Sequence, residues 1–363
     1  MTDAESLAAW LRLTLIPGIG GETQRKLLAA FGLPEAIFAA GRSAVRGVIG
    51  DKAASLLLDT DNQTAVSAAL DWSAAAGQHI VTLADPEYPQ NLLEIPDPPA
   101  LIYVRGRLEL LNRPALAIVG SRNATPQGIQ NAERFAAALA DAGLLIASGL
   151  ALGIDGAAHR GALAAGGDTV AFIGTGIDRI YPARNRELAL EIGSKGAIIS
   201  EFPLGTPVAA ANFPRRNRLI SGVSRGVLVV EAAVESGSQI TARLAAEQGR
   251  EVFAIPGSIH SPQSRGCHKL IKQGAKLVET AQDVLEELRW GRSSAPRPDA
   301  IAEVGAPGNQ LLSAMGFDPC GVDELAGRCG LTAEVLSVML LHLELDGRIA
   351  SLPGGRYQQL PDG

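Results

Sequence analysis

Two different patterns of apolar residues divide the chain. Up to about residue 80, apolar positions recur with the three- and four-residue spacing of amphipathic helices, in the runs 7–15, 25–31 and 53–58. Further on, short and almost continuous aliphatic runs alternate with helical stretches; these runs are 116–119, 144–147, 170–173, 197–199, 227–230 and 252–255. Strands of this kind, each followed by a helix, are typical of a parallel sheet covered on both faces. The pattern predicts an α/β fold with a Rossmann-like core.

The first helical segment, residues 1–80, contains a distinctive turn. Ile16-Pro17-Gly18-Ile19-Gly20-Gly21 separates its first two helical runs, as in a helix-hairpin-helix or a SAM-like domain. In a helix-hairpin-helix, backbone amides at the start of the second helix can face a DNA phosphate. Glycine and proline also simply punctuate helices, so a plain structural hairpin is an equal alternative.

The last part of the chain has a third pattern. Residues 291–307 are rich in small residues and proline and are expected to form a linker. Three helical runs, 311–315, 322–328 and 332–345, then precede two short strand-like runs, which predicts a winged-helix domain over 308–360. The run 332–345 would be the recognition helix, yet it contains no Lys or Arg. We therefore expect this domain to contact protein or to regulate, and we assign the Rossmann-like domain to 81–290.

Composition excludes several classes of protein. The chain has 363 residues, of which 47% are hydrophobic, so it is not intrinsically disordered. No apolar run approaches the length of a membrane span, and the first residues lack the character of a signal peptide, so we expect a cytoplasmic protein. The three cysteines form no C-x-x-C pair, which argues against disulfides and structural zinc.

Charge is distributed unevenly along the chain. The net charge is −6, which argues against one broad basic surface. Residues 1–80 carry 6 basic and 8 acidic residues, and 308–360 carry 3 and 6, whereas 81–290 carry 21 of each. Any cationic site is therefore a local concentration, which we expect in the middle of the chain.

The densest local concentration of positive charge lies at 213–225. This stretch, which reads FPRRNRLISGVSR, contains four arginines and no acidic residue. It follows a strand and is expected to open a helix at the carboxyl edge of the sheet, where ligands of such folds bind. Guanidinium groups near a helix N-terminus suit phosphates, and Phe213 offers a surface on which a base can stack. The alternative is a solvated face, or ion pairs with Glu201, Glu231 and Glu235.

Other polar turns follow neighbouring strands. Ser121, Arg122 and Asn123 come directly after the first aliphatic run, where the glycine-rich dinucleotide fingerprint is absent. The stretch from Glu235 to Thr241 places glycine and hydroxyl side chains at a helix start, as in an anion-binding nest. Simple helix caps would explain the same residues, Asn123 in particular. Arg184, in a turn on the same edge, could extend the patch.

Signatures of catalysis are missing from the sequence. It contains no phosphate-binding G-x-x-x-x-G-K-[ST], no G-x-S-x-G and no H-E-x-x-H motif. Asp155 and His159 lie four residues apart, which suits acid–base chemistry, but no nucleophile or metal ligand lies near them in sequence. We expect a helix cap and a structural histidine there, and neither metal nor cofactor.

Several of these stretches together resemble the DNA-processing protein A (DprA, or Smf) family. The matching residues are Tyr88-Pro89, Pro98–Tyr103, Ile118–Arg122, Ser148–Ala151, Gly153–Asp155 with His159, Phe213-Pro214 with Arg216–Arg218, Glu231-Ala232 with Ser236–Ser238, and Gly249-Arg250 with Pro256-Gly257. The flanking helical and winged-helix segments fit the usual layout of the family, although less specifically.

The resemblance implies a function as well as a fold. It implies a cytoplasmic protein that binds single-stranded DNA during natural transformation, in competent cells, protects the incoming strand and helps to load the RecA recombinase for DNA recombination. It also implies a homodimer formed through the Rossmann-like domain, without a cofactor or enzymatic activity. The implied DNA-binding residues, together with two neighbours suggested by the turns, are Ser121, Arg122, Asn123, Arg184, Phe213, Arg215, Arg216, Asn217, Arg218, Gly237, Ser238 and Thr241.

Two other classes of function compete with this interpretation. The fold also resembles the lysine-decarboxylase-like nucleotide hydrolases, whose P-G-G-x-G-T-x-x-E motif carries a catalytic glutamate. Here Thr241 stands about where that glutamate belongs, so the acid is missing. A winged-helix regulator with a ligand-sensing core is the third possibility, and the acidic recognition helix argues against it.

Overall fold

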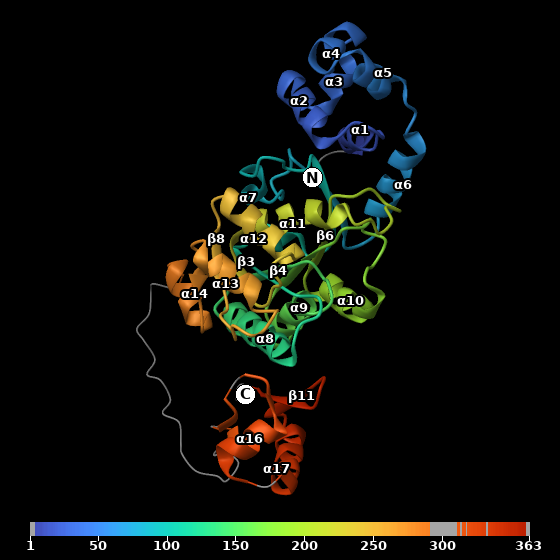
Figure 1. The fold of residues 1–363 in the computed structure, drawn as a ribbon. Helices are drawn as coiled ribbons and strands as arrows, with labels where there is room; N and C mark the ends of the chain where they lie inside the picture. Colours follow the sequence, from blue (N-terminus) through green and yellow to red (C-terminus); the bar gives the residue numbers. More distant parts are fainter. Residues whose placement is uncertain (1–3, 291–310, 313, 317, 332, 361–363) are drawn as a thin grey trace.

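A nine-stranded sheet forms the centre of the protein (Figure 1). The computed structural model describes residues 4–290 and 311–360, apart from 313, 317 and 332. In chain order the strands are β1 (Gln78–Thr82), β2 (Leu101–Gly106), β3 (Ala115–Val119), β4 (Leu145–Ser148), β5 (Thr169–Phe172), β6 (Ala197–Ser200), β7 (Ser224–Val229), β8 (Glu251–Ala254) and β9 (Lys276–Leu277). The six aliphatic runs of the sequence become β3 to β8, which confirms the predicted α/β fold.

The order of the strands determines where a ligand can bind. Across the sheet the order is β1-β2-β6-β5-β4-β3-β7-β8-β9. The seven strands β6, β5, β4, β3, β7, β8 and β9 run parallel to one another. β2 instead pairs antiparallel with both β1 and β6. The chain runs outward from β3 to β6 in one direction and from β7 to β9 in the other. The switch point of the topology therefore lies between β3 and β7, where ligands of open α/β sheets bind.

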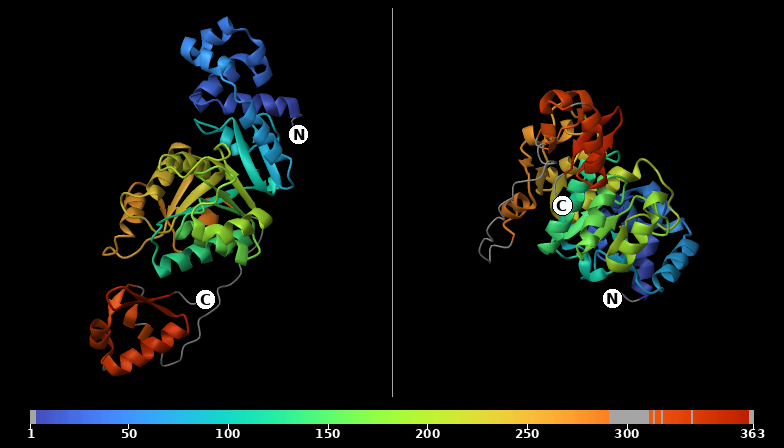
Figure 2. Two further views of the ribbon diagram at one scale, coloured as in Figure 1. Left: turned by 90° about the vertical axis from the view of Figure 1, so that its right-hand side faces the viewer. Right: turned by 90° about the horizontal axis from the view of Figure 1, so that it is seen from below.

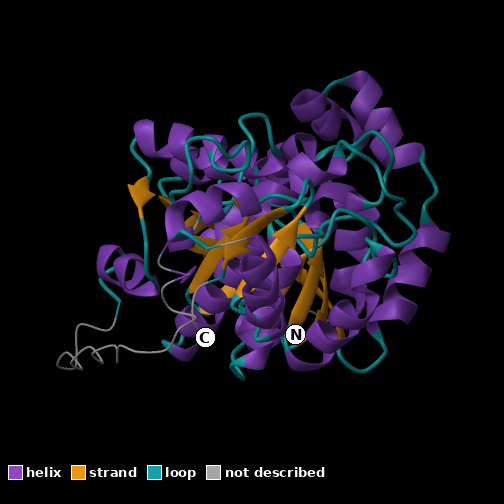
Figure 3. Ribbon diagram, turned by 60° about the horizontal axis from the view of Figure 1, so that its bottom comes forward, coloured by secondary structure: helices purple, strands orange, loops and turns teal. Residues whose placement is uncertain are grey.

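Helices cover both faces of this sheet (Figure 3). Leu116 and Ile118 face a core shared with α8 (Pro126–Asp141), α9 (Ile154–Ala164) and α14 (Ala281–Glu287). Ala117 and Val119 alternate with them and face the other core, which includes residues of four further helices: α7 (Gln90–Leu93), α11 (Asn212–Val223), α12 (Gly237–Glu247) and α13 (Arg265–Lys272). This alternation along one strand is the two-residue period expected of a sheet buried on both sides.

The N-terminal helices form a bundle with its own core. They are α1 (Ala4–Thr14), α2 (Gly21–Phe31), α3 (Pro34–Ala39), α4 (Arg42–Ile49), α5 (Asp51–Asp59) and α6 (Gln63–Ser73). Leu13, Leu27 and Leu57 belong to this core. Trp10 of α1 and Val66 of α6 instead join a cluster with β2, β6 and α10 (Arg186–Lys195). The bundle is thus anchored to one end of the sheet (Figure 2).

The C-terminal segment has the fold predicted for it. It contains α16 (Val322–Cys329) and α17 (Ala333–Leu345), and a small antiparallel sheet of β10 (Cys320–Gly321), β11 (Ile349–Leu352) and β12 (Arg356–Gln359). Helices and strands share one core that includes Leu325, Leu336 and Leu340. Val338, Leu341 and Leu345 of α17 are exposed. The predicted linker 291–307 lies outside the described residues, and the domain boundaries stay predictions.

Three strands of the central sheet, and β10 of the C-terminal sheet, were not predicted. β1 begins at Gln78, before the expected change of domain at residue 80, and β1 and β2 add an antiparallel pair to the parallel core. β9 has only two residues, Lys276 and Leu277, and forms an edge of the sheet. Edge strands lack the continuous aliphatic pattern because fewer of their residues are buried on both faces. Within the described part of the chain, no helix has the length and apolar character needed to cross a membrane.

Candidate functional site

A pocket of about 550 Å³ opens at the switch point of the sheet. Elements from both halves of the core line it: the turn after β3 and the starts of α9, α11 and α12. Nine of the twelve predicted site residues are among its lining residues, namely Ser121, Arg122, Asn123, Phe213, Arg216, Asn217, Gly237, Ser238 and Thr241. The structure thus brings together residues that are more than 100 positions apart in the sequence. The other three predicted residues, Arg184, Arg215 and Arg218, do not line this pocket.

The loop between β3 and α8 is held by Glu231, two residues after the end of β7. The backbone carbonyl of Glu231 accepts a hydrogen bond from the Ser121 amide at 2.7 Å. Its carboxylate accepts from the Thr125 amide at 2.9 Å and from the Thr125 hydroxyl at 2.5 Å. Burial raises the pKa of Glu231, and the two bonds from Thr125 oppose that rise. The loop that carries Arg122 is therefore fixed at both of its ends.

This loop corrects one expectation about helix capping. Asn123 does not cap α8, because the N-cap residue is Thr125. The Thr125 hydroxyl accepts from the Gly128 amide at 3.0 Å, and Pro126 begins the helix. Asn123 is exposed on the pocket wall instead. Its side chain is thus left available to a ligand.

Arg122 supplies an accessible positive charge to the pocket. Its side chain is exposed, and its guanidinium carbon lies 5.1 Å from the centre of the Phe213 ring. A cation in this position is attracted by the electron-rich face of the ring. No carboxylate of the described residues forms an ion pair with Arg122. The guanidinium is therefore oriented by an aromatic ring and keeps its hydrogen-bond donors for an anion.

Arg216 forms part of the pocket floor and is buried. Its Nη1 donates to the carbonyl of Phe172 at 2.6 Å and to that of Gly149, and its Nε donates to the Asn217 side chain at 3.1 Å. Burial lowers the pKa of Arg216 to about 10, while the charge of Asp155 opposes this change. Arg216 therefore stays charged at neutral pH and joins the ends of β4 and β5. The Nη1 and Nε groups of Arg216 therefore donate to the protein itself rather than to a ligand.

Asp155 and His159 lie beneath the same pocket. Asp155 lines the pocket and accepts from the Gly149 amide at 3.2 Å; burial raises its pKa. His159 is fully buried, and its Nδ1 lies 2.7 Å from the Thr169 hydroxyl. Burial and the nearby charges of Arg216 and Arg160 lower the pKa of His159 to about 3. His159 is thus a neutral structural residue, as the sequence indicated. The helix cap expected at Asp155 is wrong, because the N-cap residue of α9 is Gly153 and Asp155 accepts from Gly149 instead.

The start of α12 forms the wall opposite the β3–α8 loop. The hydroxyl oxygens of Ser236 and Ser238 lie 2.9 Å apart, and Asn217 donates to the carbonyl of Gly237 at 3.3 Å. Gly237 is exposed, with open space where a side chain would project. The first amides of a helix have no partner within the helix and carry partial positive charge, so they suit an anion. The residues of the predicted nest therefore line the same pocket as Arg122.

Arg218 and Arg215 share a buried acidic partner. Arg218 donates to Glu201 at 2.7 and 2.8 Å and to Asp97 at 3.1 Å. Arg215 lies 3.4 Å from Glu201, and its guanidinium carbon is 5.2 Å from the centre of the Phe202 ring. The alternative of internal ion pairs thus holds for these two residues. Arg184 is exposed in the short 3₁₀ turn before α10.

The glycine turn of the N-terminal hairpin faces the sheet domain. Arg25 of α2 forms an ion pair with Asp97 and donates to the carbonyl of Pro98 at 3.2 Å. Gly20 and Gly21 line a cavity of about 220 Å³ together with Asp97 and Glu201. Arg25, Arg215 and Arg218 line the same cavity, and ion pairs join them to these two carboxylates. The turn of this hairpin is thus packed against the sheet domain.

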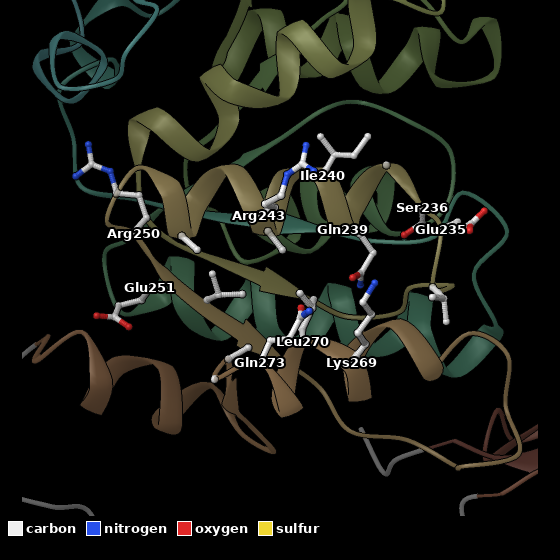
Figure 4. Close-up of a pocket in the computed structure, with 17 residues that line it drawn as sticks. Glu235, Ser236, Gln239, Ile240, Arg243, Arg250, Glu251, Lys269, Leu270 and Gln273 are labelled. Atoms are coloured by element: carbon white, nitrogen blue, oxygen red, sulfur yellow. The ribbon is translucent and has the colours of Figure 1, made fainter.

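A larger groove, of about 890 Å³, lies between α12 and α13 (Figure 4). Its charged and amide side chains come from both helices and from the β8 edge: Glu235, Gln239, Arg243, Arg250, Glu251, Lys269 and Gln273. Of the predicted site residues, only Gly237 lines it. Both signs of charge occur in the groove, so it offers no cationic surface. The described residues also contain no cluster of three or more His, Cys, Asp or Glu side chains suited to a metal ion.

Comparison with known proteins identifies relatives along most of the chain. Residues 79–289 match the family model "DNA recombination-mediator protein A", and 295–355 match "DprA winged helix domain". Protein Smf of Escherichia coli is 40% identical over 98% of this chain and 96% of its own length. DNA processing protein DprA of Streptococcus pneumoniae is 48% identical over 58% of this chain and 74% of its own length.

Solved structures agree with these sequence relatives. DNA processing protein A from Streptococcus pneumoniae has a TM-score of 0.68 and 37% identity, over 79% of this chain and 98% of its own. DNA processing protein A from Helicobacter pylori, studied for its single-stranded DNA binding mode, has a TM-score of 0.53 and 32% identity. That match covers 58% of this chain and 96% of the other. On the evidence of its sheet, its winged helix and these matches, the chain belongs to the DNA recombination-mediator protein A family.

Proposed function

We propose that the protein binds single-stranded DNA in the pocket at the switch point of the sheet. One observation carries the proposal: the exposed, unpaired guanidinium of Arg122 lies on the ring of Phe213, across the pocket from the start of α12. Arg122 and the helix amides suit a backbone phosphate, and Phe213 suits a base. The single-stranded DNA binding of the Helicobacter pylori relative supports the same ligand.

The contacts proposed for the strand differ in their role. Ser121, Arg122, Asn123, Phe213, Gly237, Ser238 and Thr241 are proposed to touch it, and Arg216 and Asn217 to shape the floor beneath it. We propose that the DNA strand makes outer contacts, beyond the pocket, with Arg184, Arg215 and Arg218. Because Arg215 and Arg218 are paired with Glu201, we expect their contribution to be smaller than that of Arg122.

We also propose the biological role that membership of the family supports. The protein acts in DNA processing during natural transformation, in the cytoplasm, where it protects an incoming strand and helps to load RecA onto it. It acts as a homodimer formed through the Rossmann-like domain and catalyses no reaction. The family membership supports this role, and RecA filament assembly on single-stranded DNA, measured with and without the protein, tests it.

Nucleotide hydrolysis is the second candidate, because the pocket does contain a carboxylate. Asp155 lies in the pocket floor, and its raised pKa is a feature common at catalytic sites. However, its carboxylate accepts the Gly149 amide and lies near the charge of Arg216, which explains it as a structural group. Release of free base from a nucleoside monophosphate by the purified protein would favour the hydrolase.

The proposed function is tested by comparing single-stranded with duplex DNA. We expect a mixed-sequence oligonucleotide to bind more tightly as a single strand than as a duplex, because stacking on Phe213 needs an unpaired base. We also expect the affinity to fall steeply with salt, because phosphate contacts release counterions. Equal or tighter binding of the duplex, or an affinity independent of salt, would contradict the proposal.

A further inference from the structure

One aromatic side chain near the pocket has no role in the function described so far. Tyr181, in the loop before α10, is 43% exposed. Among the described residues it is the one aromatic side chain that is exposed, since the others are buried or half-buried. Aromatic rings are usually withdrawn from water, because burying each of them removes a large apolar area. An exposed ring at the edge of a binding pocket therefore indicates a contact with a ligand.

Tyr181 is not an isolated surface residue, because it lies against Phe213. The centres of the two rings are 6.0 Å apart, and their planes are inclined at 41°. Both rings line a small cleft of about 50 Å³ together with Arg122, Gly174 and other residues. Phe213 also packs closely against Gly174, because a Cβ added to Gly174 would lie 3.1 Å from its ring. Phe213 thus connects the cation of Arg122 to the exposed ring of Tyr181.

The dimensions decide where a planar ligand can lie. A ring inserted between two parallel rings needs two contact distances of about 3.5 Å each, or about 7 Å in all. The separation of 6.0 Å and the inclined planes are too tight for such a sandwich. The cleft between the rings is also small. A planar group therefore stacks on the exposed face of Tyr181 and continues the line of rings outward from the pocket.

We infer that Tyr181 and Phe213 form a stacking surface for a nucleobase beside the phosphate site of Arg122. The inference rests on the proposed binding of single-stranded DNA and adds a base contact to it. A phosphate at Arg122 would lie next to Phe213, so an adjoining base of the same strand can reach the row of rings. Stacking needs no particular hydrogen-bond pattern, so this contact accepts every base and requires that the base is unpaired.

The test compares three substitutions with two oligonucleotides. Tyr181→Ala removes the ring, Tyr181→Phe keeps it, and Leu190→Ala removes another exposed apolar side chain, on α10, as a matched control. The probes are a labelled strand of thymidylates and a strand of the same length in which every nucleotide is abasic. Because Tyr181 is exposed, we expect all three variants to fold normally, which thermal unfolding checks.

The expected results separate stacking from a merely structural role. Tyr181→Ala should weaken binding of the thymidylate strand about five- to tenfold, in the lower part of the range for stacking on an aromatic ring. Tyr181→Phe and Leu190→Ala should bind it as the unchanged chain does. On the abasic strand, Tyr181→Ala and the unchanged chain should bind equally.

Two results would overturn the inference. If Tyr181→Ala binds the thymidylate strand as tightly as the unchanged chain, the ring makes no contact with a base. If the loss is equally large on the abasic strand, Tyr181 acts on the loop rather than on a base. Failure of the unchanged chain to bind either strand would instead remove the proposed function itself, so the two failures are distinguishable.

Discussion

The guanidinium of Arg122 lies over the ring of Phe213, with 5.1 Å between the guanidinium carbon and the ring centre. The two residues are 91 positions apart in the sequence and come from the loop after β3 and the start of α11. Glu231 fixes that loop through Ser121 and Thr125. The sheet thus positions a cation and an aromatic ring as one unit at the mouth of the pocket.

This unit leads to a prediction for Arg122. Arg122→Ala should weaken binding of single-stranded DNA about tenfold or more, because a charged hydrogen bond to a phosphate is lost. It should also reduce the slope of log affinity against log salt by about 0.7, the value for one contact to a single strand. Fluorescence anisotropy at several salt concentrations measures both effects.

Two controls accompany the Arg122 measurement. Arg122→Lys keeps the charge and should restore most of the salt slope, although not the planar contact with Phe213. Arg42→Ala removes a charge on α4, in the N-terminal bundle, and should leave strand binding unchanged. An unchanged affinity in Arg122→Ala would remove Arg122 from the site.

Arg218 should behave differently, because its charge is already neutralised within the protein. The side chains of Arg218 and Glu201 are 12% and 4% exposed, so removing Arg218 leaves the buried carboxylate of Glu201 with only the longer, 3.4 Å contact to Arg215. Arg218→Ala should lower the free energy of unfolding by about 3 kcal/mol, the lower end for a broken buried ion pair. Its effect on strand binding should be smaller than that of Arg122→Ala.

Chemical denaturation of the Arg218 variant, with and without a second substitution, checks this explanation. Adding Glu201→Gln to Arg218→Ala removes the buried negative charge that has lost its main partner. The double variant should therefore recover part of the lost free energy of unfolding. If Arg218→Ala is as stable as the unchanged chain but binds single-stranded DNA as weakly as Arg122→Ala, Arg218 contacts DNA directly and this explanation is wrong.

His159 should make stability sensitive to acid. In the folded protein its pKa is lowered to about 3, whereas in the unfolded chain it is about 6.5. Between these values the unfolded chain binds a proton that the folded chain does not bind. The free energy of unfolding therefore falls by up to about 1.4 kcal/mol per pH unit as the pH drops below about 6.5.

His159→Gln isolates this effect, because every other titrating group stays in place. The variant should be less stable than the unchanged chain near neutral pH, because the fitted contact with Thr169 is disturbed. The difference in the free energy of unfolding between the two proteins should shrink by about 2 kcal/mol from about pH 7.5 to about pH 5, since only the unchanged chain loses stability through protonation of His159. A pH-independent difference in urea unfolding would show that His159 titrates normally in the folded state.

The sequence predicted the core of the fold because both faces of β3 to β8 are buried. Such strands are almost entirely aliphatic, so their positions can be read directly from runs such as 116–119. The edge strands β1 and β9 were missed, because β1 mixes polar and apolar residues and β9 has only two residues. β2, between β1 and β6, was missed although it begins with four buried apolar residues, Leu101–Val104. Pattern alone also assigned the cap of α8 to Asn123, two residues before its true position.

The site was predicted as a set of residue types, but their individual roles depended on tertiary contacts. The stretch FPRRNR contains three arginines that look equivalent in sequence. On α11, however, the helical rotation points Arg216 into the floor and Arg218 toward Glu201 and Asp97. Asp97 is 121 positions from Arg218, so no local pattern could reveal that pair. Tyr181 was missed for the same reason, because its exposure and its contact with Phe213 exist only in the fold.

The last prediction concerns Gly153, whose backbone lies directly against the loop that carries Arg122. Its backbone angles are φ 75° and ψ −128°, which glycine adopts far more readily than other residues. A Cβ at this position would also lie 2.2 Å from the Ser121 carbonyl oxygen and 2.7 Å from that of Arg122. Gly153→Ala should therefore both strain the backbone and push the loop away from Phe213.

Gly32 provides a matched control for this effect. Its angles, φ 83° and ψ −126°, are almost the same as those of Gly153, but nothing lies within 4 Å of an added Cβ. Gly32→Ala should cost about 1–2 kcal/mol of stability through strain alone and should bind single-stranded DNA normally. Gly153→Ala should cost more and should weaken strand binding about as much as Arg122→Ala. If both variants lose only stability, the position of the Ser121–Arg122 loop does not control binding.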